Sequence, residues 1–376
     1  MKNDSRRSFV KKLGLGIGST AILPTVTSFK TFSEKSRSPL GVKKLNVALC
    51  GLGRYANMLA TGLMESEYCQ LSGIITGTPQ KALLWKEKYK IPEQNIYNYN
   101  NFDDIKNNND IDLVYIVLPN GMHKEYTIKA AKAGKHVIVE KPMAISVLEC
   151  QEMIDVCKNA GVQLAVGYRL HYEPHHIEIK RLGQKKVFGQ VRLIEASLGY
   201  DLTGTPPNDW HLNKVLAGGG ALMNLGIYCI QSNRYVLGEE PSSVTAQFAP
   251  ITMPDLFTEV EENISWQLNF PSGAIGTSTT TSNCNVDRFF ASADSGYFEL
   301  APAISYGPFK GRTSVQEFNY PVINQQAAQL DGIGKLLLEK RSLPSHISGE
   351  EGLKDIRVIE AIYKSAETEN KIYISN

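Results

Sequence analysis

The chain has 376 residues, which is enough for two domains, and it contains 40 basic and 38 acidic side chains. The first 27 residues hold five of the basic side chains and one acidic side chain, so the remainder carries a slight negative charge. Such a balance excludes the basic surplus that is typical of nucleic-acid-binding proteins, and it leaves no polybasic patch for a membrane surface. The six cysteines include no Cys-x-x-Cys pair and do not demand a disulfide.

Residues 1–28 are predicted to be an export signal. Arg6 and Arg7 precede a modest apolar run, Leu13–Leu23, which is too short to span a bilayer as a helix of the mature protein. Paired arginines before such a run are typical of the twin-arginine (Tat) route, and the alternative is a disordered basic N-terminus. The polar residues 29–43 follow as a flexible arm. We therefore expect a periplasmic protein whose only contact with a membrane is its export.

A glycine-rich turn follows the first predicted strand. The apolar run Val47–Cys50 leads into Gly51, Gly53 and Ala56, where a helical pattern begins at once. In a dinucleotide-binding turn the first glycine allows the tight bend, the second lets the backbone approach a pyrophosphate, and the small third residue lets the helix pack on the strand. The helix N-terminus offers its free N–H groups to the anion. This context favours a dinucleotide site over an ordinary glycine loop.

Strands and helices then alternate as far as residue 167. We expect further strands at 71–76, 112–118, 137–140 and 163–167, and helices from Thr78-Pro79 onward, at 123–133 and at 146–160. This rhythm is typical of a parallel sheet with helices on both faces. Residues 44–167 are therefore predicted to be a Rossmann domain of the α/β class.

The pattern changes after residue 168. Longer strands are predicted at 189–200, 243–249, 259–270, 273–281, 286–292 and 295–300, with a helix at 219–237 between them and two helices, 323–340 and 349–367, at the end. Such a run of strands indicates a mainly antiparallel sheet. Residues 168–376 are accordingly predicted to be a second α/β domain that binds the substrate.

The end of the second strand indicates which cofactor is bound. An acidic residue at this point binds the ribose of NAD, and this chain instead has Thr76, Gly77, Thr78 and, a little later, Lys81. Hydroxyl groups, a bare backbone and a cation suit the 2′-phosphate of NADP. We therefore expect NADP rather than NAD. The alternative interpretation of Lys81 is a solvated helix residue.

Polar residues follow the next two central strands. Asn120 and His123 follow the predicted strand 112–118, next to Leu118 and Pro119. Glu140 and Lys141 lie at the end of the predicted strand 137–140. Open α/β sheets bind ligands at the carboxyl ends of their strands, so this edge is the predicted cofactor site. Lys141 can there reach both a nicotinamide and a substrate hydroxyl, whereas in isolation Glu-Lys-Pro would be a turn with a surface ion pair.

Asn224 and Tyr228 lie four residues apart in a predicted helix, on one face, after the glycines 218–220. Glycines at this point permit close approach of another backbone or a ligand. Tyr228 alone would be more typical of a core tyrosine.

Three histidines, His171, His175 and His176, are close in sequence. His175 and His176 are adjacent and cannot share a helical face, and no carboxylate–histidine spacing accompanies them. We therefore predict no metal site.

Taken together, these motifs resemble the Gfo/Idh/MocA oxidoreductases, and among them the exported glucose–fructose oxidoreductase subgroup. The resemblance runs from about residue 44 to the end. Its motifs are the twin-arginine leader, Gly-Leu-Gly-Arg-Tyr-Ala (51–56), Gly-Thr-Pro-Gln-Lys (77–81), Ile-Tyr-Asn-Tyr (96–99), Glu-Lys-Pro (140–142), Gly-Tyr-Arg-Leu-His-Tyr-Glu-Pro (167–174), Ala-Gly-Gly-Gly-Ala-Leu-Met-Asn-Leu-Gly-Ile-Tyr (217–228) and Ser-Gly-Glu-Glu-Gly-Leu (348–353).

The resemblance implies a nicotinamide between Lys141 and Tyr228 and a large open sheet that pairs subunits, so we expect a homodimer or homotetramer. It also implies further cofactor-binding residues, which are Leu52, Tyr55, Tyr99, Arg169 and Trp210. The chain departs from the family at Asn224, where an aspartate is usual, and at His211, where the subgroup tends to have arginine. Many members have histidine where Tyr228 stands, although the subgroup has tyrosine.

The predicted function is transfer of a hydride between a sugar or polyol and a tightly bound NADP. Tyr228 would accept the proton of the substrate hydroxyl, Lys141 would orient that hydroxyl and lower the pKa of the tyrosine, and Asn224 would hold the pair in place. Two alternatives remain open at this point. One is a glycosidase that uses its nicotinamide transiently, and the other is a non-catalytic sensor of sugar or cofactor.

Overall fold

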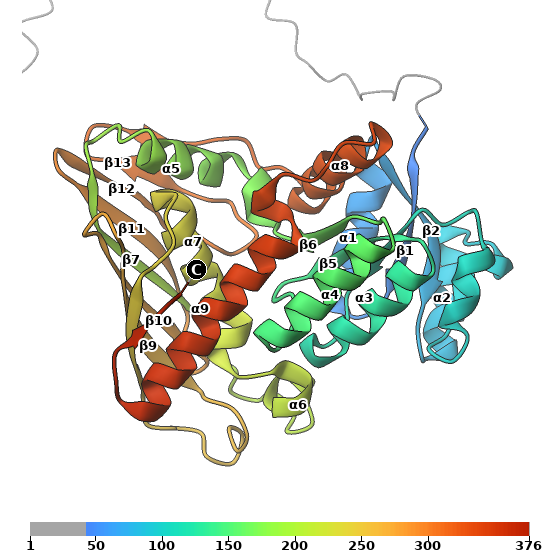
Figure 1. Ribbon diagram of the computed structural model, residues 1–376, viewed down its shortest axis with the longest axis horizontal. Helices are drawn as coiled ribbons and strands as arrows, with labels where there is room; N and C mark the ends of the chain where they lie inside the picture. Colours follow the sequence, from blue (N-terminus) through green and yellow to red (C-terminus); the bar gives the residue numbers. More distant parts are fainter. Residues whose placement is uncertain (1–42, 376) are drawn as a thin grey trace, which may run out of the picture. The chain divides into compact units, whose positions relative to one another are not determined.

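The computed structural model describes residues 43–375 (Figure 1). The predicted export signal and nearly all of the predicted arm lie outside the described residues. The described part of the chain forms two β-sheets, which are built by successive portions of the sequence.

The first sheet has six parallel strands in the order β3-β2-β1-β4-β5-β6. The strands are β1 (Leu45–Cys50), β2 (Cys69–Ile75), β3 (Ile96–Tyr97), β4 (Leu113–Ile116), β5 (His136–Glu140) and β6 (Leu164–Gly167), and the helices are α1 (Arg54–Glu65), α2 (Pro79–Tyr89), α3 (His123–Lys132) and α4 (Val147–Asn159). The strand order confirms the predicted Rossmann fold. The two-residue strand β3 was not predicted.

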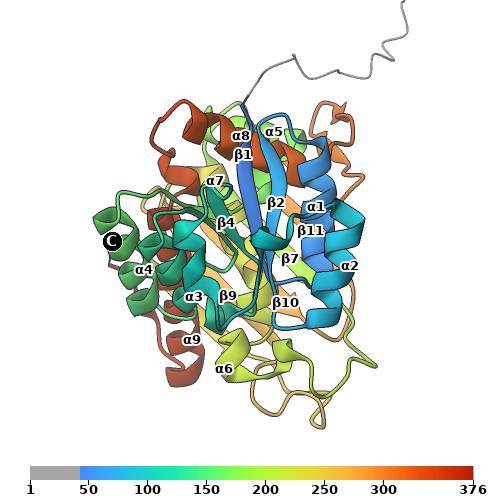
Figure 2. The ribbon, with the colours of Figure 1, turned by 90° about the vertical axis from the view of Figure 1, so that its right-hand side faces the viewer.

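Strand β1 is buried on both faces, and its side chains alternate between two cores. Val47 and Leu49 pack with α1, whereas Ala48 and Cys50 belong to the core under α3 and α4. Figure 2 shows these two helix pairs on opposite sides of the sheet, with α1 and α2 on one side and α3 and α4 on the other. The continuous apolar sequence of β1 follows from this double burial.

The second sheet has nine strands in the order β14-β13-β12-β11-β7-β10-β9-β8-β15. These are β7 (Val191–Gly199), β8 (Ser243–Phe248), β9 (Asn263–Asn269), β10 (Ile275–Thr281), β11 (Val286–Ala293), β12 (Gly296–Leu300), β13 (Gly311–Thr313), β14 (Glu317–Phe318) and β15 (Ile372–Tyr373). Only β7 and β10 pair in parallel, and the other neighbours are antiparallel. The prediction of a mainly antiparallel sheet is confirmed.

Helices cover one face of this second sheet (Figure 1). They are α5 (Pro174–Gln184), α7 (Ile227–Leu237) and α9 (Gly349–Thr368), and the short α6 (Lys214–Ala217) precedes α7. The opposite face carries polar side chains around a shallow hollow of about 530 Å³, lined by Glu195, Ser197, Thr245, Gln247, Ser265, Gln267, Thr277 and Thr279 among others. This surface is called the open face below.

One helix late in the chain returns to the first sheet. Helix α8 (Gln325–Leu338) packs its Leu330 and Ile333 into the same core as Leu59 of α1. The Asp331 carboxylate accepts hydrogen bonds from the Ser66 hydroxyl (2.5 Å) and from the backbone N–H groups of Glu67 (2.8 Å) and Tyr68 (3.1 Å). Residues 168–376 therefore contribute to both lobes of the protein.

Candidate active site

The turn between β1 and α1 has the geometry of a dinucleotide-binding turn. Gly51 has φ +98°, and a Cβ atom there would overlap the Val117 carbonyl oxygen at the end of β4. Gly53 is the N-cap of α1 and has open space where a side chain would stand. The first turn of α1 contains no acidic residue. A helix N-terminus with bare backbone in front of it suits a diphosphate, so these residues fit a dinucleotide.

The end of β2 lies beside an aromatic ring. Tyr99 lies directly against Gly77, because a Cβ on this glycine would come within 2.9 Å of the tyrosine ring. Burial raises the pKa of Tyr99 to about 12, so the phenol is neutral. Thr76 is buried and accepts a hydrogen bond from the Thr78 N–H (3.2 Å). Lys81 is exposed in the first turn of α2.

Two predicted cofactor residues also contact neighbouring loops. His123 is fully buried, and its Nδ1 and Nε2 lie 2.9 Å from the carbonyl oxygens of Pro142 and Leu118, respectively. Burial lowers its pKa to about 4, so the ring is neutral. The Asn120 side chain donates to the Ala217 carbonyl (2.8 Å) of α6. Both ring nitrogens of His123 face loop carbonyl groups, and a neutral ring donates to one of them. Its assignment to the cofactor site stays a prediction.

Lys141 and Tyr228 come together as predicted. The Lys141 Nζ lies 4.5 Å from the centroid of the Tyr228 ring, and the Arg169 Cζ lies 5.4 Å from the same centroid. Burial acts to raise the pKa of Tyr228, but the positive charges of Lys141 and then Arg169 oppose it, and the net pKa is below the ordinary value of 10.0. A phenol with a pKa lowered by two nearby cations is suited to accept a proton.

Asn224 contacts Lys141 through its backbone and not through its side chain. The Lys141 Nζ donates to the Asn224 carbonyl oxygen (2.9 Å), which corrects the expectation that the amide side chain holds the pair. Residues Leu222–Gly226 form a π-helical turn before α7, and such turns widen the helix and displace its carbonyl groups. This local geometry could not be read from helical spacing.

The carboxylate of Glu261 binds backbone groups at the start of that π-helical turn. Glu261 accepts hydrogen bonds from the N–H groups of Gly220 and Leu222 (both 2.8 Å) and from the Tyr363 hydroxyl (2.9 Å). A Cβ on Gly220 would overlap the Glu261 backbone. The sequence predicted that glycines at this point admit either another backbone or a ligand. At Gly220 the structure shows another backbone, that of Glu261.

Glu140 lies behind Lys141. Its carboxyl group accepts a hydrogen bond from the Tyr115 hydroxyl (2.6 Å), which in turn accepts one from the Gln329 side chain of α8 (2.6 Å). Burial raises the pKa of Glu140 to about 7. A side chain on Gly167 would come within 2.8 Å of the Tyr115 hydroxyl, so the glycine leaves room for this chain of contacts.

Several residues around the pair were not predicted to belong to the site. Tyr306 lies with its ring centroid 4.4 Å from the Arg169 Cζ and is 45% exposed, and Tyr200 is 39% exposed. His211 stacks on the predicted Trp210 with 3.7 Å between ring centroids, and its Nδ1 lies 2.6 Å from Asp209. Burial lowers the pKa of His211, and the charge of Lys141 adds to that effect. Tyr200 and Tyr306 stand outside any motif, so no local signal could have found them.

The remaining predicted residues surround this group. Leu52 is buried beside the glycine turn, and burial together with the Glu140 charge raises the pKa of Tyr55. The Tyr55 hydroxyl lies 3.5 Å from the Gln326 side chain of α8. Leu118 is buried at the end of β4, directly before Pro119. These positions place both the first and the second portion of the sequence around one edge of the six-stranded sheet.

Comparison with known proteins agrees with this geometry. Residues 45–168 match the family described as "Oxidoreductase family, NAD-binding Rossmann fold", and residues 176–299 match the "GFO/IDH/MocA C-terminal domain". The chain is similar to the solved aldose–aldose oxidoreductase of Caulobacter crescentus, with 39% identity, 88% of this chain and 100% of that chain covered, and a TM-score of 0.84.

More distant relatives have the same organisation. The D-xylose 1-dehydrogenase [NADP(+)] of Haloarcula marismortui is 26% identical over 86% of this chain and 92% of its own. A scyllo-inositol dehydrogenase from Lactobacillus casei shares the fold, at 18% identity, 89% and 99% coverage and a TM-score of 0.74. The dinucleotide turn, the Lys141–Tyr228 pair and the two matching domains together show that the chain belongs to the Gfo/Idh/MocA oxidoreductase family.

Proposed function

We propose that this protein is an NADP-dependent oxidoreductase that transfers a hydride between a sugar or polyol and a tightly held nicotinamide cofactor. The observation that carries the proposal is the position of Tyr228, whose ring lies close to the cations of both Lys141 and Arg169. The names of the similar proteins from Caulobacter crescentus and Haloarcula marismortui support a carbohydrate substrate. Direct assay of aldoses and polyols with NADP and NADPH tests the proposal.

Different residues of the chain have different roles in this reaction. When bound, the nicotinamide supplies the hydride acceptor or donor, and Gly51, Gly53 and the N-terminus of α1 would hold its diphosphate. In the oxidation direction the Tyr228 oxygen takes the proton of a substrate hydroxyl, while a hydride leaves the carbon that bears the hydroxyl. Lys141 stabilises the phenolate and orients the hydroxyl. Proton and hydride together account for the two hydrogens that the substrate loses.

The preference for NADP rests on the exposed Lys81 and on the absence of a carboxylate from residues 76–81. We expect Lys81→Ala to reduce the preference for NADP over NAD by about 1–3 kcal/mol, the scale of a hydrogen bond to a charged group. Dissociation constants for both nucleotides, measured by fluorescence titration, give this value. Lys88→Ala, near the other end of α2, is the matched control and should leave the ratio unchanged. Equal affinities in the parent protein would contradict the proposal.

We further propose that the protein works in the periplasm after export by the Tat route. Free NADP is not expected there, so the chain should fold and load its cofactor before export and then recycle it in place. One sugar would reduce the cofactor and a second carbonyl substrate would reoxidise it. We expect mass spectrometry to find NADP or NADPH in protein isolated from the periplasm. Nucleotide-free, active protein from that compartment would contradict this proposal.

We also propose that the open face pairs two or four copies of the chain. It is a broad polar sheet surface with a hollow of about 530 Å³, and the described helices lie on the other side of the sheet. Sedimentation analysis is expected to give a dimer or tetramer, and Thr279→Arg, in the hollow, should shift it toward the monomer. A monomeric parent protein would argue against this surface as an interface.

A substitution at position 224 tests whether the protein is an enzyme or a non-catalytic sensor. We expect Asn224→Asp to move the pH–rate profile toward higher pH, because it adds a negative charge on the residue whose backbone carbonyl accepts from Lys141, and such a charge raises the pKa of the Tyr228 phenol. The phenolate then forms only at higher pH. Asn224→Leu, of similar size and uncharged, is the control and should not produce the shift. If the parent protein turns over no sugar and Asn224→Asp switches turnover on, the protein is a sensor.

A further inference from the structure

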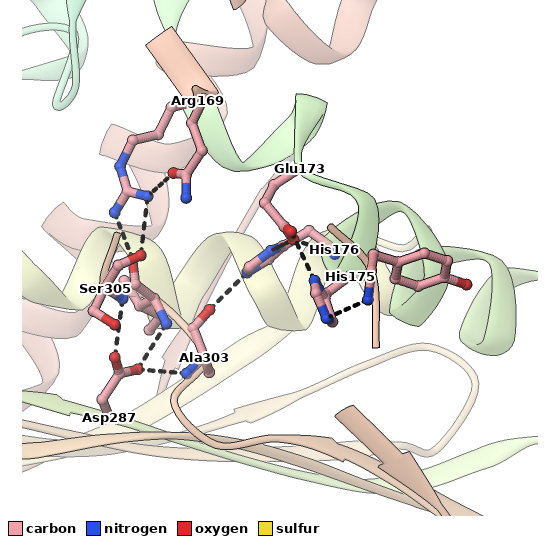
Figure 3. A network of polar contacts seen from close by, with 10 residues as sticks. Arg169, Glu173, His175, His176, Asp287, Ala303 and Ser305 are labelled. Carbon is pink, nitrogen blue, oxygen red and sulfur yellow. Dashed lines mark hydrogen bonds and ion pairs between the residues drawn. The ribbon is translucent and has the colours of Figure 1, made fainter. Parts of the chain in front are cut away.

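The loop of residues 301–306 reaches the active site with Tyr306 at its end, and a single carboxylate holds its amides. Asp287, the second residue of β11, accepts hydrogen bonds from three consecutive backbone N–H groups (Figure 3). The distances are 2.8 Å from Ala303 and 2.7 Å from Ile304 to Oδ1, and 2.9 Å from Ser305 to Oδ2. Three bonds to one anion fix the course of the loop, because hydrogen bonds to ionised acceptors are among the stronger ones.

The carbonyl groups of the same three residues are held from the other side. The Ala303 oxygen lies 2.7 Å from the His176 Nε2, and the Nδ1 of this histidine lies 2.7 Å from Glu173 (Figure 3). The Arg169 guanidinium donates to the carbonyl oxygen of Ser305 (3.3 Å) and to that of Ile304. All six polar backbone groups of residues 303–305 are thus engaged, and these contacts define the position of the loop.

Arg169 connects this loop to the proposed proton acceptor. Its side chain is only 3% exposed, and its Cζ lies 4.4 Å from the Tyr306 ring centroid and 5.4 Å from that of Tyr228. The guanidinium also donates to the Gln325 side chain at the start of α8. Two of its acceptors are loop carbonyls, so the place of the guanidinium beside Tyr228 depends on where the loop lies.

We propose that Asp287 is a positioning residue for the reaction: by holding the amides of Ala303, Ile304 and Ser305, it keeps Tyr306 and the Arg169 guanidinium in place against Tyr228. Asp287 itself donates nothing to the substrate and acts only through the loop. This inference extends the proposed function, and the catalytic role of Asp287 rests on that function. The geometry itself is independent of which sugar reacts.

The test compares two changes at Asp287 with a control at the other end of the same strand. Asp287→Ala removes all three acceptors, and Asp287→Asn keeps one oxygen and loses the charge. Asp294, directly after β11, accepts hydrogen bonds from the Gln190 N–H (2.9 Å) and from Arg192 (2.7 Å). Neither partner belongs to the loop of residues 301–306, so Asp294→Asn is the matched control. Each variant is also made in a Tyr228→Phe background.

Two readouts are needed. The first is the ultraviolet absorbance of tyrosinate as a function of pH, taken as the difference between each variant and its Tyr228→Phe partner, which reports the ionisation of Tyr228 without any substrate. The second is kcat and KM over the same pH range. The affinity for NADP, measured by titration, shows whether the first sheet remains folded.

In Asp287→Ala we expect the ionisation of Tyr228 to move to higher pH, because a loosened loop no longer holds the Arg169 charge beside it. We expect kcat to fall by about 10- to 100-fold, the scale of a small misplacement of reacting groups, with NADP affinity changing less than kcat. Asp287→Asn should lie between Asp287→Ala and the parent. Asp294→Asn should alter neither the titration nor kcat.

A folded Asp287→Ala protein that titrates Tyr228 at the parent pH would overturn the proposal, as would a loss of kcat that Asp294→Asn shares. If Asp287→Ala does not fold, Asp287→Asn decides by the same two readouts. If the parent protein turns over no sugar or polyol, the proposed function fails, and the tyrosinate titration still decides whether Asp287 positions Arg169.

Discussion

Tyr228→Phe should lower the rate of the chemical step by about 10²–10⁴-fold, the usual contribution of a positioned proton acceptor. Phenylalanine keeps the ring that packs beside Lys141, so the helix and its packing are preserved while the accepting oxygen is lost. Single-turnover kinetics of NADPH formation measure the effect. NADP affinity should remain at the parent value, because the diphosphate would be held by the β1–α1 turn.

The control for Tyr228→Phe is the same substitution at a tyrosine outside the site. Tyr89→Phe, on α2 beside Trp85, removes a phenol oxygen outside the cluster around Lys141 and should leave the rate unchanged. A Tyr228→Phe protein that retains the parent rate would show that another group accepts the proton.

Lys141→Met should reduce the rate by a similar factor and should also shift its pH dependence. Among the charges around Tyr228, that of Lys141 does most to lower the pKa of the phenol, against the effect of burial. Without it the phenolate forms at higher pH, so activity near neutrality falls and the profile moves upward. Methionine keeps the length and apolar stem of the side chain, so we expect the protein to remain folded.

The pH series separates a lost charge from a lost fold. At a pH above the new pKa of Tyr228, part of the activity of Lys141→Met should return, whereas a misfolded site would stay inactive at every pH. Lys132→Met, at the end of α3, is the control and should change neither the rate nor the profile. An unchanged profile in Lys141→Met would mean that Arg169 alone sets the ionisation of Tyr228.

The parts of the fold that the sequence predicts well are those that depend on neighbours in the chain. The turn at Gly51 requires a positive φ and close contact with Val117, and both requirements appear in the sequence as a glycine directly after an apolar strand. The strands of the first sheet are buried on both faces, so they appear in the sequence as continuous apolar runs that are easy to recognise. Lys141 could be placed because it follows such a strand.

The parts that could not be predicted depend on residues far apart in the sequence. Tyr306 joins the site because Asp287 and Arg169, distant from it in the chain, hold its loop. The Asn224 carbonyl accepts from Lys141 within a π-helical turn whose first N–H, that of Leu222, is bound by the distant Glu261. Helix α5 is different, because its start does have a local signal: Glu173 caps it and Pro174 occupies its first turn.

The return of α8 to the first sheet has a consequence for exchanging parts between relatives. Leu330 and Ile333 fill a core that residues 44–167 leave uncovered by themselves, and Asp331 ties the end of α1 to this late helix. The cofactor-binding half is therefore not a detachable module of contiguous sequence. A chimera that replaces everything after residue 167 with the matching portion of a homologue must carry residues 325–338 over from this chain, or else recreate their packing, to keep its nucleotide-binding half soluble.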